Sequence, residues 1–295
     1  MNLLSCIVLI TMMVGVGCAR TPSYQFPVHK ETKYFDFHYE RNSPNIEERA
    51  HFADAFVTVV NRDFFKTDYD YPIRVFVLEN GTRLDEFVNR ELHIPGPAGF
   101  GMYIYSQKLL ATYESSGLGT FTHETMHALV NKNLSNRPSW ADEGIPTFFE
   151  KVYGYWKDNE LILFWGFHNP WRIEELGNNL ARLNLSEILS DVRPESDESK
   201  LRMVSLFLWK QGKFKRFLRL IASNDKHGYP SFFEGAMEMP LERTTSLWIS
   251  YLHDVEEHRS SILSLPLSNV FDNEVDFQRF AKLNNLSTEQ VKQEE

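Results

Sequence analysis

The 295-residue sequence lacks several features that would point to common protein classes. Its two cysteines, Cys6 and Cys18, both lie within the first 18 residues, so the remainder of the chain can form no disulfide. The formal net charge is −9, and no Lys/Arg cluster supplies a basic face. Because binding of phosphates requires such a face, the sequence argues against nucleic acid as a partner.

Long apolar runs are also missing, except at the N-terminus. The first 18 residues, MNLLSCIVLITMMVGVGC, carry no charge, and their apolar run of about 14 residues is typical of a secretory signal and short for a membrane span. The ending VGVGC-AR resembles a bacterial lipoprotein signal, in which Cys18 becomes the lipidated first residue. We therefore expect an exported, membrane-anchored lipoprotein of the bacterial cell envelope. Simple cleavage and an uncleaved anchor are the alternatives.

The chain after the signal is predicted to form one α+β domain between a tether and a tail. Residues 19–30 contain two prolines and are predicted to form the tether, and residues 261–295 the C-terminal tail. The domain is divided into a strand-rich part, the helices of the candidate site and a mainly helical part, at 31–119, 120–156 and 157–260.

The periodicity of apolar residues predicts the individual elements. The predicted strands cover 33–40, 74–79, 102–106 and 108–113, the last two being one kinked strand in the alternative interpretation. The predicted helices cover 45–65, 83–92, a segment ending near 134, and a segment from Ser139 through TFFEKVY. From about residue 172 onward the pattern predicts helices only.

The segment THETMHALV contains the pattern that carries the strongest chemical signal. His123 and His127 are four residues apart and therefore lie on one face of the predicted helix, where two imidazoles can bind one Zn²⁺. Glu124 is rotated by about 100° from His123, so it flanks the metal and can take a proton from the attacking water. The alternative is an ordinary helix with two incidental histidines.

A catalytic zinc site needs a third protein ligand and an open fourth position. Glu143, in the segment RPSWADEGIPTFFE, follows on the next predicted helix, and a short antiparallel helix pair can bring its carboxylate to the histidines. Asp142 can hydrogen-bond a ligand histidine as an outer-sphere partner. The alternative for Glu143 is a first-turn carboxylate that complements the helix dipole.

HETMH followed by PSWADEGIPTFFE resembles the gluzincin metallopeptidases, specifically the peptidase MA-like group. This resemblance implies a zincin-like α+β fold with a small N-terminal sheet, His123, His127 and Glu143 as zinc ligands, and Glu124 as general base and acid. It also implies an edge strand that binds extended peptide by backbone pairing, formed by residues including Phe100, Gly101, Met102 and Tyr103.

The sequence departs from the gluzincin pattern at two places. Pro146 stands where a helix-favouring residue is usual and should kink the second helix. The later helix RPESDESKLRMVSLFLW has no tyrosine to stabilise an oxyanion, and Tyr153, Tyr155, Arg202 and His227 are the substitutes considered.

We therefore predict a zinc metallopeptidase that acts on peptide or protein substrates. The alternatives are a metal-binding pseudo-peptidase and a non-enzymatic surface lipoprotein. The sequence leaves open the physiological substrate and the oligomeric state.

Overall fold

The computed structural model describes residues 24–65, 72–190, 198–223, 228, 231–289 and 291–294. The fold is α+β, as the sequence predicts. The signal segment and Cys18 lie outside the described residues. Among the helices that the structure describes, none combines the length and apolar character needed to cross a bilayer.

The first half of the chain builds a five-stranded sheet in the order β1-β2-β3-β5-β4. The three central strands, β2 (Phe35–Tyr39), β3 (Ile73–Leu78) and β5 (Leu109–Tyr113), run parallel to one another. The edge strands β1 (Val28–Glu31) and β4 (Gly101–Ile104) are antiparallel to their neighbours. Strand β1 begins within the predicted tether, so the tether prediction is wrong from Val28 onward.

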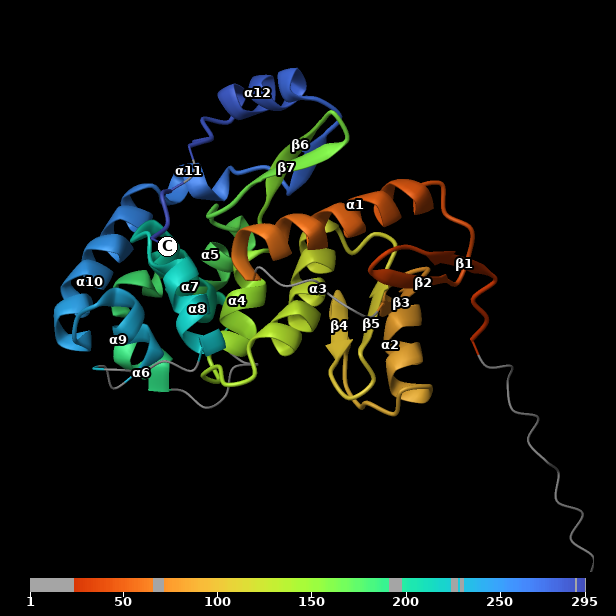
Figure 1. The fold of residues 1–295 in the computed structure, drawn as a ribbon, viewed down its shortest axis with the longest axis horizontal. Helices are drawn as coiled ribbons and strands as arrows, with labels where there is room; N and C mark the ends of the chain where they lie inside the picture. Colours follow the sequence, from red (N-terminus) through yellow and green to blue (C-terminus); the bar gives the residue numbers. More distant parts are fainter. Residues whose placement is uncertain are drawn as a thin grey trace, which may run out of the picture.

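Helices cover both faces of this sheet because parallel strands require crossover connections. Helices α1 (Ile46–Val60) and α3 (Leu118–Asn133) pack with the face that carries Phe35, Phe37 and Tyr39. Helix α2 (Gly81–Arg90) covers the other face, as Figure 1 shows. The alternation of buried and half-buried residues along β2 fits a strand whose two faces meet different layers.

The second half consists mainly of helices packed beside α3. Helix α4 (Ala141–Phe148) contacts both α3 and α7 (Glu198–Lys210). The other helices before the C-terminal segment are α5 (Pro170–Leu176), the 3-10 helix η2 (Gly177–Arg182), α6 (Leu185–Ser190), α8 (Phe214–Ser223), α9 (Phe232–Met237), α10 (Leu241–Glu257) and α11 (Arg259–Leu263). In the first half, the short π-helix η1 (Asn61–Phe65) follows α1 directly.

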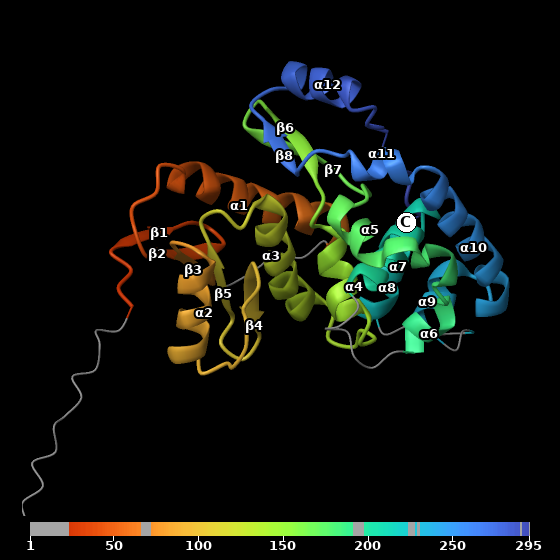
Figure 2. The ribbon, with the colours of Figure 1, turned by 180° about the vertical axis from the view of Figure 1, so that it is seen from behind.

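A second sheet has the order β7-β6-β8 and corrects two predictions. The predicted helix through Tyr153 ends at Phe148, and β6 (Tyr153–Lys157) and β7 (Glu160–Phe164) form an antiparallel hairpin instead. The predicted tail contains β8 (Asn269–Phe271), which pairs in parallel with β6, and α12 (Glu274–Leu283). Figure 2 shows these C-terminal elements beside β6.

Candidate metal centre

Helix α3 carries the HETMH motif through the protein interior. All its residues from Phe121 to Val130 are buried, so this helix is covered on every side rather than along one stripe. His123, Glu124 and His127 are only 7%, 7% and 5% exposed. Because a buried polar group is costly without a partner, these side chains need partners inside the protein.

Helix α4 folds back and brings Glu143 to the two histidines. Glu143 Oε2 lies 3.4 Å from Nε2 of His123 and 3.4 Å from Nε2 of His127, and the two nitrogens are 3.0 Å apart. Ligand atoms at the corners of a tetrahedron around Zn²⁺ are about 3.3 Å apart. The three atoms can therefore surround one zinc ion, with the fourth corner left for water or substrate.

The buried carboxylate oxygen of Glu143 supports this assignment. Within the described part of the chain, Glu143 Oε2 is buried and makes no hydrogen bond of ordinary geometry. A buried acceptor without a partner is uncommon and costs free energy. A cation between Glu143 and the histidines would satisfy this oxygen.

Gly144 explains how α4 can approach the neighbouring helix closely. A Cβ atom at this position would lie 3.2 Å from the backbone oxygen of Leu201 in α7 and 3.1 Å from the Trp140 ring. Ser205 of α7 also donates a hydrogen bond of 2.6 Å to the Gly144 carbonyl. The glycine after Glu143 therefore allows α7 to support the helix that carries the third candidate ligand.

The outer-sphere carboxylate of His123 is Glu150 rather than Asp142. Asp142, predicted as an outer-sphere partner, forms an ion pair with Arg137. Glu150 Oε1 lies 3.1 Å from His123 Nδ1. This ion-pair contact does not have ordinary hydrogen-bond geometry, and it leaves Nε2 free as the ligand atom.

Glu150 is held in turn by a buried polar network. Its Oε2 accepts hydrogen bonds of 3.1 Å from Asn169 and 3.1 Å from Arg172. Arg172 also pairs with Glu198, whose carboxylate lies within 4.8 Å of His123 and Glu150 ligand atoms. The Arg172 guanidinium therefore already supplies the positive charge for this carboxylate pair, and we assign no metal to it.

Tyr105 provides the corresponding partner for His127. Its hydroxyl lies 2.8 Å from His127 Nδ1, and the two rings meet edge to face. With Nε2 as ligand atom, Nδ1 carries the hydrogen and donates to the tyrosine oxygen. No spacing or motif in the sequence predicts this role for Tyr105.

Glu124 occupies the space between the histidines and strand β4. Its Oε1 lies 4.0 Å from His123 Nε2. A Cβ atom at Gly101 would lie 3.1 Å from Glu124 Cγ and 2.9 Å from Thr120 Cγ2, so only glycine lets the strand pack this closely on α3. Glu124 is therefore next to both the candidate metal ligands and the sheet edge.

Strand β4 is an edge strand, as the resemblance implies. Met102 and Tyr103 pair with Ala111 and Leu110 of β5, which leaves the other side of β4 without a partner strand among the described residues. Phe100, just before the strand, is 60% exposed. This edge can accept an extended chain by backbone pairing.

Electrostatics in the centre depends on the close packing of carboxylates and imidazoles. Burial lowers the pKa of His123, but Glu143 and Glu150 outweigh it, and the pKa lies well above its usual range. Burial raises the pKa of Glu143, yet contact with both histidines lowers it to about 2. Burial raises the pKa of Glu124, which makes its carboxylate a stronger base. A metal that binds His123 must displace its proton.

The side chains considered for oxyanion stabilisation are engaged elsewhere. The Tyr153 hydroxyl donates to the Pro266 carbonyl, and Tyr155 packs against Phe277. Arg202 donates to the Phe167 carbonyl. His227 lies outside the described residues.

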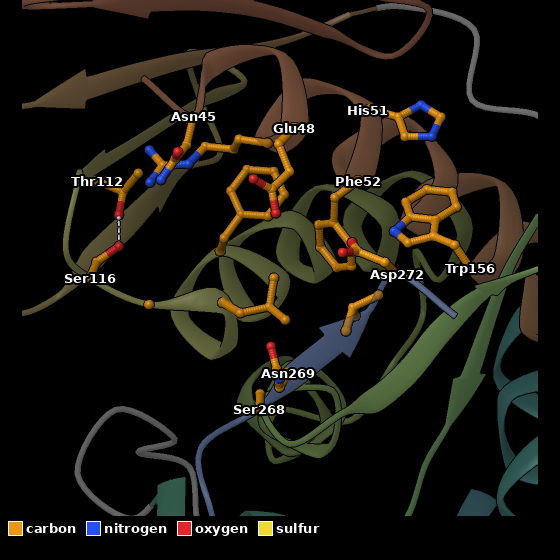
Figure 3. Close-up of a pocket in the computed structure, with 15 residues that line it drawn as sticks. Asn45, Glu48, His51, Phe52, Thr112, Ser116, Trp156, Ser268, Asn269 and Asp272 are labelled. Atoms are coloured by element: carbon orange, nitrogen blue, oxygen red, sulfur yellow. Dashed lines mark hydrogen bonds between the residues drawn. The ribbon is translucent and has the colours of Figure 1, made fainter. Parts of the chain in front are cut away.

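A separate cavity of about 300 Å³ lies between α1, the start of α3 and β8. Figure 3 shows its walls, in which Thr112 is hydrogen-bonded to Ser116 and the His51 ring lies over Trp156. None of the candidate metal ligands lines this cavity, and neither does Glu124. The cavity is therefore not the cleft in which the candidate centre would act.

No protein-family model matches this chain, and no curated protein is similar enough to it to count as a relative. The resemblance to gluzincins therefore depends on the short motif, and the case for a metal centre depends on the geometry of His123, His127 and Glu143.

Proposed function

We propose that the protein is a zinc-dependent peptidase of the gluzincin type. The observation that carries this proposal is the triangle of His123 Nε2, His127 Nε2 and Glu143 Oε2, with sides of 3.0, 3.4 and 3.4 Å. Two imidazoles and one carboxylate with an open fourth position are the ligand set of catalytic zinc sites. A purely structural zinc site would instead fill all four positions with protein ligands.

The proposed mechanism assigns a separate task to each side chain. Zn²⁺, when bound, lowers the pKa of a water molecule and polarises the scissile carbonyl. The Glu124 carboxylate accepts a proton from the attacking water and then delivers it to the leaving amine. Glu150 and Tyr105 keep the two imidazole rings oriented through their Nδ1 atoms.

The substrate class follows from the edge strand beside Glu124. An extended peptide that pairs with β4 would run along the side of α3 that carries Glu124. Backbone pairing recognises any extended chain, and neighbouring side chains then select among sequences. The proposed substrates are therefore peptides or unfolded protein segments.

The test combines zinc analysis with activity against a peptide library. We expect the dialysed wild-type chain to retain one tightly bound zinc and Glu143→Ala to lose it. Glu124→Gln should retain this zinc while the turnover rate falls by about 10²–10⁴-fold, the usual contribution of a general base. A zinc-replete, folded wild-type chain without tightly bound zinc would refute the proposed site.

A metal-binding pseudo-peptidase is the second candidate. It is favoured by the engagement of Tyr153, Tyr155 and Arg202 outside the centre, since loss of an oxyanion donor costs about 10²–10³ in rate. Wild-type activity equal to that of Glu124→Gln, with zinc bound in both, would support this candidate over the peptidase.

A further inference from the structure

A second group of potential metal ligands lies on the β1–β2 ladder. His29 is directly opposite His38, and Glu31, two residues after His29, is directly opposite Asp36, two residues before His38. Because directly opposite residues, and residues two apart on a strand, point to the same face, the ladder places two imidazoles and two carboxylates together. The spacing is set by strand register and does not require a loop.

The side chains of three of these residues are already in contact. His38 Nε2 lies 3.0 Å from one oxygen of Asp36, and His29 Nε2 contacts the other. The two imidazole rings are 4.8 Å apart between centroids. One nitrogen from each histidine and one Asp36 oxygen lie within 4.8 Å of one another, so small side-chain rotations are enough for all three to reach one ion.

The surroundings hold one histidine in place and leave the other accessible. The His38 ring stacks on Phe76 at 4.9 Å with an interplanar angle of 15°. The His29 side chain is 46% exposed. A cation can therefore enter from solvent beside His29 and meet a ligand on His38 whose orientation is fixed by packing.

This group is distinct from the candidate metal centre. Strand β1 and strand β4 are the two opposite edges of the five-stranded sheet (Figure 1). Phe35 and Phe37 belong to the core that includes α3, whereas the neighbouring His38 packs against Phe76 on the opposite face. The two ligand groups therefore do not share a side chain or a face of the sheet.

We propose that His29, Asp36 and His38 form a surface site for a late first-row transition-metal ion. Zn²⁺ and Cu²⁺ are the ions best suited to these ligands. Imidazole with carboxylate suits these ions, whereas Ca²⁺ and Mg²⁺ require oxygen ligands. The ion replaces the protons that now join the histidines to Asp36, and water completes its coordination. Bound metal links β1 to β2 and so fixes the N-terminal edge strand to the sheet.

Calorimetric titration of the chelator-stripped full chain with Zn²⁺ tests this proposal. We expect two classes of site in the wild type, one tight and one weaker. The double variant H29Q/H38Q should lose the weaker class, with its Zn²⁺ affinity reduced by at least about 100-fold. Loss of a single outer-sphere partner can already cost about 100-fold, and this variant removes two direct ligands. Glu143→Gln should lose the tight class and keep the weaker one, so failure of either site is distinguishable from failure of the other.

His258→Gln is the matched control because His258 is exposed and has a carboxylate partner, Asp254, at 3.4 Å. This variant should keep both classes of site.

Cu²⁺ added to Glu143→Gln should give an electron paramagnetic resonance spectrum with nitrogen couplings, and the H29Q substitution in that background should weaken them. If H38Q changes the circular dichroism spectrum, the fold is disturbed in the double variant. The Zn²⁺ titration of the single variant H29Q, at the more exposed position, then tests the proposal. Unchanged binding in the histidine variants, or an equal loss in His258→Gln, would overturn the proposal.

Discussion

The two groups of histidines and carboxylates differ mainly in how they are enclosed. His123, His127 and Glu143 lie on two buried helices, and each histidine has its own outer-sphere partner, Glu150 or Tyr105. The group on β1 and β2 is more exposed, and strand register together with the packing of His38 against Phe76 and Phe26 positions it. The comparison shows that burial of ligand residues requires a second layer of polar partners, whereas exposed ligands can rely on water.

The largest difference should appear when one carboxylate is removed from each group. Glu150→Ala removes the buried acceptor of Asn169 and Arg172, and the Arg172 guanidinium, only 6% exposed, keeps Glu198 as its carboxylate partner, so we expect the free energy of unfolding of the metal-free protein to fall by about 3 kcal/mol. Asp36→Ala should lower it by no more than about 1 kcal/mol, because its partners are solvent-accessible. Urea unfolding of both variants measures this, and equal losses would contradict the role assigned to burial.

A smaller effect, on zinc affinity, is expected when the hydroxyl of an outer-sphere partner is removed. Tyr105→Phe removes the hydroxyl beside His127 Nδ1 and should weaken zinc binding at the buried centre by about 10–100-fold, with little change in stability. Tyr113→Phe is the control, since Tyr113 lies on the neighbouring strand β5 with its ring beside Phe100. Competition with a chromophoric chelator gives both affinities. An unchanged zinc affinity in Tyr105→Phe would show that the hydroxyl does not position the ring.

The last expected effect concerns a buried histidine near which cations outweigh one carboxylate, Asp254. Burial, followed by the charges of Arg202 and Lys210, lowers the pKa of His168 to about 3. The unfolded chain takes up a proton at this residue near pH 6.5, so His168 should make the protein less stable as pH falls from about 6.5 toward 3, by about 2 kcal/mol at pH 5.

His168→Gln should remove this part of the pH dependence. The difference in unfolding free energy between wild type and variant, measured at pH 7 and at pH 5, isolates the contribution of His168. An identical difference at both pH values would show that the pKa of His168 is not depressed.

The sequence predicted the elements whose periodicity is strong. The strand at Phe35–Tyr39 and the helix through His123 have clear two-residue and 3.6-residue patterns, and both are present. The predicted helix was extended beyond Phe148 to Tyr153, the first residue of β6, because an apolar run such as TFFEKVY has no alternation that would separate a strand from a buried helix. Strand β8 has only three residues, which is too short for any periodicity.

The candidate site was partly predictable for a similar reason. His123, His127 and Glu143 follow from a spacing within helices, and the structure brings them together. Glu150 was missed, although it follows Glu143 by seven residues, about two helical turns, which is a spacing that returns to the same face. Asp142 was predicted because it is adjacent to Glu143, and adjacency in sequence does not show that Asp142 pairs with Arg137.

The pairing of β8 with β6 has a consequence for the order in which the protein can fold. The Pro266 carbonyl accepts a hydrogen bond from Lys151, 115 residues earlier, and Ser268 donates to the Glu150 carbonyl across 118 residues. Contacts between such distant residues form late, since their loop-closure entropy must be overcome first. The ribosome therefore releases the segment around Glu150 well before the residues that bond to it, and the centre can be completed only after Pro266 and Ser268 have been synthesised.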